Sequence, residues 1–105
     1  MKIKLMADYE SFPLWDLGPD GPRNLDPSAL SLSPGLQESL DAWASRYDAT
    51  LDRRDPARSG FADRLEERAF DEDGLRLASR LKVELGDDSV VVYFEHSSGR
   101  TVEVA

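Results

Sequence analysis

The sequence predicts an α+β fold in which a two-helix hairpin covers one face of a small antiparallel three-stranded sheet, in the order β-loop-α-α-β-β. Three observations predict it. Strand-like runs stand near both ends of the chain, two amphipathic stretches lie between them, and a proline-rich segment follows the first strand. The chain has 105 residues, a length typical of one domain. We therefore expect a single domain over residues 1–105.

The N-terminal third combines a strand with a long connection. Ile3 and Leu5 alternate with Lys2 and Lys4, which is typical of a strand with one buried face. Residues 10–33 contain four of the six prolines, so we expect a loop without a helix or a long strand. Because this loop also carries Trp15 and several leucines, it should pack against the body of the domain.

The first amphipathic stretch predicts a helix over residues 34–52. Its apolar residues recur on one helical face from Leu36 to Leu51. Ser33 is suited to cap the first turn, and Pro34 suits the first helical position.

The second amphipathic stretch predicts a helix over residues 64–85, with Asp63 and Glu66 resembling a capping box. Gly74 costs about 1 kcal/mol relative to Ala in a helix interior. Either the helix breaks near this glycine, or Gly74 permits a neighbouring element to approach closely. The apolar stripe stays in phase on both sides of Gly74, which favours the unbroken helix.

Two β-branched runs, residues 89–95 and 100–105, predict a hairpin that turns through residues 96–99. The first run is apolar on both faces, so we expect it in the centre of the sheet, between the N-terminal strand and the last strand. Val91 and Tyr93 would then decorate the uncovered face. Lys2 and Lys4 would share that face with Glu95 and Glu103, a favourable cross-strand pairing of charges.

Composition excludes several classes of function. The net charge is −8, so the chain has no general attraction for nucleic acid or for anionic membranes. The absence of Cys excludes disulfides and thiolate chemistry, and the single His excludes sites that need two imidazoles. No apolar run is long enough to cross a membrane. With no secretory segment and no cysteine, we expect a cytoplasmic protein.

The chain offers little for catalysis or for metal binding. His96 is the only imidazole and falls in the predicted hairpin turn, where water is not excluded. No complete set of metal ligands and no phosphate-binding loop is recognisable, so we expect no cofactor. Acidic residues on the second helix have the i,i+4 spacing of solvated ion pairs; the two pairs are Glu72 with Arg76 and Arg80 with Glu84. An enzyme that uses Asp or Glu alone ranks last among the hypotheses.

The chain has more residues suited to binding a partner than residues suited to catalysis, and several of them lie in the proline-rich loop. We assign partner binding to Phe12, Trp15, Asp16 and Asp20. Trp15 either seals the end of the core or anchors a partner, because a rigid aromatic ring buries much area at a small entropic cost. Asp16 and Asp20 follow it and should meet water or the Arg and Lys residues of a partner.

Sequence motifs spread over most of the chain resemble those of a group of small bacterial proteins with no assigned activity. The motifs are K-I-K-L-M-A-D-Y at residues 2–9, P-L-W at 13–15, N-L-D-P at 24–27, S-G-F at 59–61 and L-G-D-D at 85–88. By size, acidity and missing catalytic groups, the chain also resembles the immunity proteins of bacterial toxin systems. That second resemblance is one of type and implies a protein that binds and blocks a toxin domain in the cytoplasm.

The leading hypothesis is thus a non-catalytic, immunity- or antitoxin-like protein that masks a basic partner surface. The alternative is a small structural domain that forms a homodimer through the open sheet face or a sheet edge. The two differ in their response to salt, since charge-led association slows as ionic strength rises and apolar association hardly changes.

Overall fold

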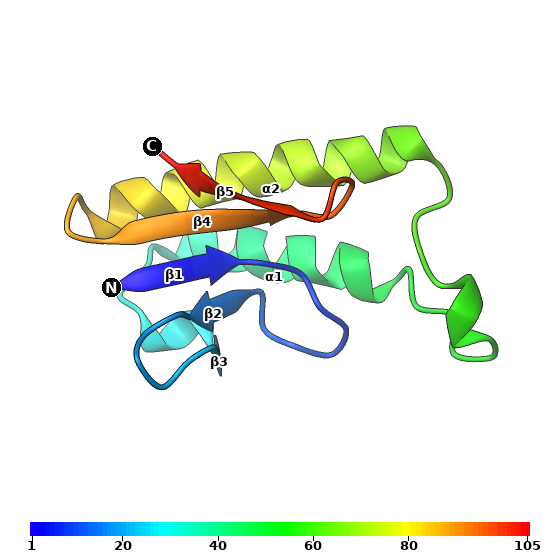
Figure 1. Ribbon diagram of the computed structural model, residues 1–105, viewed down its shortest axis with the longest axis horizontal. Coiled ribbons are helices and arrows are strands. Elements are labelled where there is room, and N and C mark those ends of the chain that lie inside the picture. The colour runs from blue at the N-terminus through cyan, green and yellow to red at the C-terminus, as the bar shows by residue number, and fades with distance from the viewer.

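The computed structural model describes residues 1–105 and confirms the α+β class. The strands are β1 (Lys2–Leu5), β2 (Leu14–Asp16), β3 (Arg23–Leu25), β4 (Val90–Glu95) and β5 (Arg100–Val104). The helices are α1 (Pro34–Asp48) and α2 (Arg64–Leu85), and short 3-10 turns stand at Pro27–Ala29 and Pro56–Arg58. Figure 1 shows α1 and α2 side by side behind the sheet, with no helix in front of it.

The sheet has five strands in the order β3-β2-β1-β4-β5, so the prediction of three strands is wrong. The prediction of an all-antiparallel sheet is also wrong, because β1 and β4 pair in parallel, with Ile3 opposite Val91 and Leu5 opposite Tyr93. The helices explain the direction of β4. As Figure 1 shows, α1 runs along the sheet in the direction of β1 and α2 returns, so β4 starts at the end where β1 starts. The central position of β4, between β1 and β5, is confirmed.

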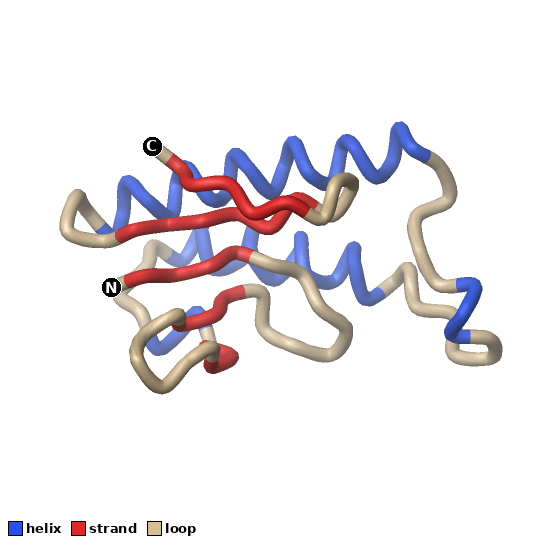
Figure 2. The backbone as a smooth tube through the Cα atoms, viewed as in Figure 1, coloured by secondary structure: helices blue, strands red, loops and turns tan.

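The two unpredicted strands lie inside the proline-rich segment. Strands β2 and β3 are three residues each and pair antiparallel, with Trp15 opposite Asn24. Pro13 and Pro22 stand just before these strands rather than inside them, where a missing N–H does not interrupt the ladder. Figure 2 shows these two short strands joined by loops to β1 and to each other. The segment packs against the core, as expected, through Leu14, which is fully buried.

The two helices begin as the sequence predicts. The Ser33 hydroxyl accepts a hydrogen bond from the Leu36 N–H at 3.3 Å, and the Asp63 carboxylate accepts one from the Glu66 N–H at 2.8 Å. Helix α1 ends at Asp48 rather than at residue 52. Helix α2 has the predicted bounds and is unbroken.

Gly74 allows side chains of α1 and of the sheet to approach the α2 backbone closely. A Cβ atom at Gly74 would lie 2.5 Å from the Tyr93 hydroxyl and 2.7 Å from the Trp43 ring. Of the two roles left open by the sequence, the structure supports close approach. The glycine therefore costs helix propensity but allows Trp43 and Tyr93 to pack against the α2 backbone.

The core lies between the helices and the sheet face that carries Ile3, Leu5, Val91 and Tyr93. The prediction that Val91 and Tyr93 lie on the open face is therefore wrong. Both faces of β4 are apolar, so the sequence alone does not distinguish them, and the buried residues of β1 decide which face is covered. The following residues share the helix-free face: Lys2, Lys4, Trp15, Val90, Val92, Phe94 and Glu103. Glu95 follows the Tyr93 side, so only Glu103 of the two predicted acidic residues shares a face with the lysines.

Candidate partner-binding surface

The four predicted binding residues lie on or beside β2, but they do not form one cluster. Trp15 lies on the helix-free face, and its indole N–H donates to the Met6 carbonyl at 3.0 Å. Asp16 lies on the opposite face, since it is the register partner of buried Ile3. Phe12 precedes the strand, and Asp20 follows it in the turn toward β3. A partner that lies flat on the helix-free face therefore contacts Trp15 but does not reach Asp16 on the opposite face.

The side chains of these four residues also differ in exposure and in the contacts that they already make. Phe12 is 46% exposed and is one of six large apolar side chains on the surface. Asp20 is exposed and makes no hydrogen bond or ion pair through its side chain. Asp16 is held from both sides, because its carboxylate accepts the Gly18 N–H at 2.9 Å and lies 3.5 Å from the Arg23 guanidinium. Phe12 and Asp20 are therefore the two side chains that a partner could reach with least rearrangement.

Negative charge is concentrated in one part of the molecule. Residues 6–52 contain nine Asp or Glu residues and two Arg residues, which gives a net charge of −7 out of −8 for the whole chain. These residues form the β1–β2 loop, the β2–β3 ribbon and α1. The remaining chain is close to balanced. Sequence reasoning identified only the part of this charge that lies in the loop.

Helix α1 extends this charge along its exposed side. Glu38, Asp41 and Asp48 are exposed and are spaced by three and seven residues, which aligns them on one side of the helix. The Asp48 carboxylate accepts the Glu10 N–H at 3.0 Å, which joins α1 to the β1–β2 loop. We call the set of Asp8, Glu10, Glu38, Asp41 and Asp48 the acidic edge. Glu10 forms an ion pair with Arg53 at 3.1 Å, and the other four members form none.

An aromatic cluster closes the end of the core from which the long α1–α2 connection projects (Figure 1). Tyr47 stacks on Tyr9 with ring centroids 4.5 Å apart, and both Tyr47 and Phe61 contact His96 edge-on. Burial, together with the nearby Tyr9 and Asp8, raises the pKa of Tyr47 to about 12. The His96 ring is half-buried, and its Nδ1 lies 2.9 Å from Glu67 Oε2. His96 lies in the turn, as predicted, but it is held in place rather than free in solvent.

A buried carboxylate that sequence reasoning missed fixes the same end of the sheet. Asp71 of α2 is only 5% exposed. It accepts hydrogen bonds from the Tyr93 hydroxyl at 2.6 Å and from the His96 and Ser97 N–H groups at 3.0 Å each. Burial alone would raise the pKa of Asp71, but these hydrogen bonds outweigh it and hold the pKa below its ordinary value. The available signal was the position of Asp71 on α2, one residue after Phe70 and three before Gly74, both of which belong to the apolar stripe.

The two predicted ion pairs on α2 are absent, and other contacts replace them. Arg76 pairs with Asp73 at 2.7 Å rather than with Glu72. The Glu84 carboxylate accepts the Ser33 N–H and hydroxyl, both at 2.7 Å, and so joins α2 to the start of α1. These bonds from Ser33 lower the pKa of Glu84. Arg80 is consequently left without a carboxylate partner within 4 Å.

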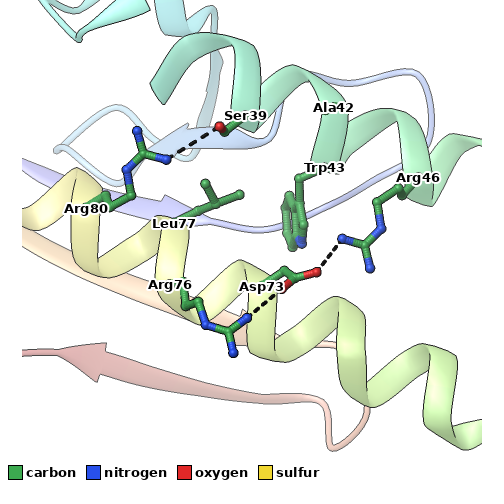
Figure 3. A pocket seen from close by; sticks show the side chains of 8 residues that line it. All are labelled: Ser39, Ala42, Trp43, Arg46, Asp73, Arg76, Leu77 and Arg80. Carbon is green, nitrogen blue, oxygen red and sulfur yellow. Dashed lines mark hydrogen bonds and ion pairs between the residues drawn. The ribbon is translucent and has the colours of Figure 1, made fainter. Parts of the chain in front are cut away.

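A hollow of about 360 Å³ lies between the exposed sides of α1 and α2 (Figure 3). Its lining residues are Ser39, Ala42, Trp43, Arg46, Asp73, Arg76, Leu77 and Arg80. The chain has no group of three or more His, Asp or Glu residues placed to hold a metal ion. No helix is long and apolar enough to span a membrane.

A family model described as Serratia CdiI immunity protein-like matches residues 1–96. The chain belongs to this family. A search of curated proteins finds no match. Family membership confirms the resemblance to immunity proteins by type and indicates a protein that binds and neutralises a toxin. Immunity proteins generally act without catalysis. The matched segment includes all the elements up to the end of β4.

Proposed function

We propose that this CdiI-like immunity protein neutralises its toxin in the cytoplasm, without catalysis, by covering a basic surface of the toxin domain. The observation that carries the proposal is the concentration of negative charge in residues 6–52, where nine acidic residues accompany two arginines. Complementary charge speeds the encounter of two proteins and fixes their orientation. Family membership supplies the toxin as the class of partner.

The proposed binding residues are Phe12, Trp15, Asp16 and Asp20. Phe12, Trp15 and Asp20 would contact the toxin, and Asp16, on the other face of β2, holds the β2–β3 turn through Gly18 and Arg23. The surface continues through the β1–β2 loop into the acidic edge. Phe12 supplies exposed apolar area, and Trp15 supplies a ring that is already fixed by its bond to Met6. Aromatic anchors surrounded by charges are typical of protein interfaces. Asp20 and Asp41 carry exposed carboxylates without an ion pair, so both are available to Lys or Arg residues of the toxin.

Two matched double variants test this assignment against the toxin domain that this chain neutralises. Asp20→Lys with Asp41→Lys changes the proposed surface, and Glu66→Lys with Glu72→Lys changes α2. Both doubles move the net charge from −8 to −4, and all four side chains are exposed and make no hydrogen bond or ion pair. Only the location of the change differs between them.

Stopped-flow association at low ionic strength is the measurement, after melting curves show that both doubles fold. We expect the first double to slow association at least tenfold, because steering by complementary charge contributes about 10- to 1,000-fold to association rates. The second double should have a smaller effect. The reverse order would move the interface to α2 and overturn the assignment.

Self-association through the helix-free sheet face is the second candidate. Val90 is 37% exposed on this face. Trp15, Val92 and Phe94 share the face with it. A homodimer held by these apolar side chains would persist at high salt, although Lys2, Lys4 and Glu103 share the face. Sedimentation equilibrium of the chain alone, at low and at high ionic strength, distinguishes the candidates: a dimer at both salt concentrations favours self-association.

A further inference from the structure

The hollow between α1 and α2 is positively charged, although it belongs to an acidic protein. Among its lining residues the charged groups are Arg46, Arg76, Arg80 and Asp73, which gives a local net charge of +2. Figure 3 shows Arg46 of α1 and Arg80 of α2 reaching across the space between the helices, with Trp43 and Leu77 between them, and Arg76 lying along α2 toward Asp73. We call this hollow, with its eight lining residues, the arginine groove.

One carboxylate holds two of the three guanidinium groups. Arg46 Nη1 lies 2.7 Å from one oxygen of Asp73, and Arg76 Nη1 lies 2.7 Å from the other. Arg46 also lies over the Phe70 ring, with its Cζ 5.5 Å from the centroid. Both guanidinium groups are thus fixed in position, while a single negative charge compensates only one of them.

The positive charge of the third guanidinium, that of Arg80, is compensated even less. Arg80 Nη1 lies 3.5 Å from the Ser39 hydroxyl, which is a neutral and distant partner. Glu84, one helical turn away, is bound to Ser33 instead. A guanidinium offers a planar set of donors that matches the two oxygens of a carboxylate. Arg76 and Arg80 are one turn apart on α2, so a carboxylate between them can accept from both.

We propose that the arginine groove receives a Glu or Asp side chain of the toxin, seated over the apolar floor formed by Trp43, Leu77 and Ala42. The inference rests on the proposed function, since the toxin supplies the carboxylate. The charge of the groove argues for this occupant: three guanidinium groups with one carboxylate match an anion and repel a basic segment. The apolar floor favours a side chain with methylene groups beside its charge over an isolated inorganic ion.

The groove gives the complex a fixed orientation that uniform charge attraction cannot supply. The acidic edge lies on α1 and the β1–β2 loop, and the arginine groove lies on the other side of α1, toward α2. A basic toxin surface that carries one acidic residue would satisfy both patches in a single arrangement. A toxin that is basic throughout would meet repulsion at the groove, so the positive site adds discrimination between partners.

The experiment uses a peptide, so it does not depend on the toxin. The probe is acetyl-Gly-Glu-Leu-Glu-Gly-amide, and its control is the same peptide with Gln at both Glu positions. The readout is the set of NMR signals from the Arg side-chain Nε–Hε groups and the Trp43 indole N–H during titration. We expect saturable shifts of Arg46, Arg76, Arg80 and Trp43 with the Glu peptide, and at least tenfold weaker binding of the Gln peptide.

Protein variants locate the site. Arg76→Gln with Arg80→Gln should abolish the shifts, while Arg64→Gln with Arg68→Gln, an equal change of charge at the start of α2, should leave them intact. If the first double does not fold, Ser39→Glu serves instead, because it places a carboxylate beside Arg80 and should block the probe.

Three results would overturn the inference. They are an absence of saturable shifts, equal binding of the Glu and Gln peptides, and binding of inorganic phosphate at the same arginines as tightly as the Glu peptide. None of them bears on toxin neutralisation, which the association measurement with the toxin tests separately.

Discussion

The Tyr93 hydroxyl donates a hydrogen bond of 2.6 Å to the Asp71 carboxylate, across the interface between the sheet and α2. The same carboxylate accepts the backbone N–H groups of His96 and Ser97. One buried side chain of α2 therefore fixes both the middle of β4 and the turn that leads to β5. Burial and the hydrogen bond to Asp71 raise the pKa of Tyr93, which keeps the phenol protonated as the donor.

Asp71→Asn should destabilise the protein by about 1.5–3 kcal/mol at pH 7, the range for hydrogen bonds to a charged group. The amide accepts fewer hydrogen bonds than the carboxylate and places an NH₂ group among donors. Urea denaturation of both proteins measures the difference, with Glu72→Gln as the exposed control on the same helix. A loss no larger than that of the control would show that the charge of Asp71 contributes nothing.

The advantage of the wild-type protein over Asp71→Asn should depend on pH in a defined direction. The folded-state pKa of Asp71 lies below its ordinary value of 3.8. The carboxylate therefore stabilises the fold fully above the unfolded-state pKa, and this contribution is lost as the pH falls through the folded-state value. Denaturation curves from pH 8 down to pH 2 should show a constant advantage above about pH 5 that shrinks below pH 3.8. An advantage that grows in acid would contradict the assignment.

Gly74→Ala should destabilise the protein although alanine is the better helix former by about 1 kcal/mol. The added Cβ would meet Tyr93 at 2.5 Å and Trp43 at 2.7 Å, and overpacking of this kind typically costs about 1–3 kcal/mol. Gly35→Ala on α1 is the matched control, since its nearest neighbour would be the Arg80 guanidinium at 3.9 Å. The melting temperature should fall for Gly74→Ala and should rise or stay unchanged for Gly35→Ala.

Trp43→Ala should cost more stability than Trp15→Ala. Trp43 is 2% exposed, stacks on Phe70 with centroids 4.3 Å apart, and donates its indole N–H to the Phe70 carbonyl. Truncation of such a residue typically costs about 3–5 kcal/mol. Trp15 is only half-buried on the helix-free face. Chemical denaturation ranks the two variants, and greater damage from Trp15→Ala would make the β2 region part of the stabilising core.

Removal of divalent metals should leave the melting temperature unchanged. No cluster of three or more acidic or histidine side chains is placed to bind a metal, so we expect folding to be independent of metal. Differential scanning fluorimetry with and without EDTA measures this, and a fall of several degrees with chelator would reveal a carboxylate site.

The helices could be predicted from sequence because their signals are local. Ser33 and Asp63 lie three residues before the N–H groups that they cap, and the apolar stripes have a helical period. The strands β2 and β3 could not, because three-residue strands between prolines contain too few residues for an alternating pattern. Parallel pairing of β1 with β4 leaves no local mark either, since their register joins residues such as Lys2 and Val90.

The candidate site shows the same division. The sequence predicts Phe12 and Asp20 as partner-binding residues, and both are exposed; their role in binding stays a prediction. The arginine groove could not be predicted, because Arg46 on α1 meets Asp73 on α2 through a contact that spans 27 residues. The i,i+4 rule assigned Arg76 and Arg80 to Glu72 and Glu84, and only the packing of the two helices shows that Ser33 competes for Glu84.

The parallel pairing of β1 and β4 has a consequence for the time at which the sheet becomes complete. Strand β4, the central neighbour of β1, begins 85 residues after the end of β1, at Val90. At a synthesis rate of roughly 5–20 residues per second, that interval lasts roughly 4–17 s. During it the Ile3 and Leu5 side chains have only the β2–β3 ribbon and the helices to cover them. A chain that ends before β4 cannot pair β1 with its central neighbour, so the complete sheet forms only after β4 has been synthesised.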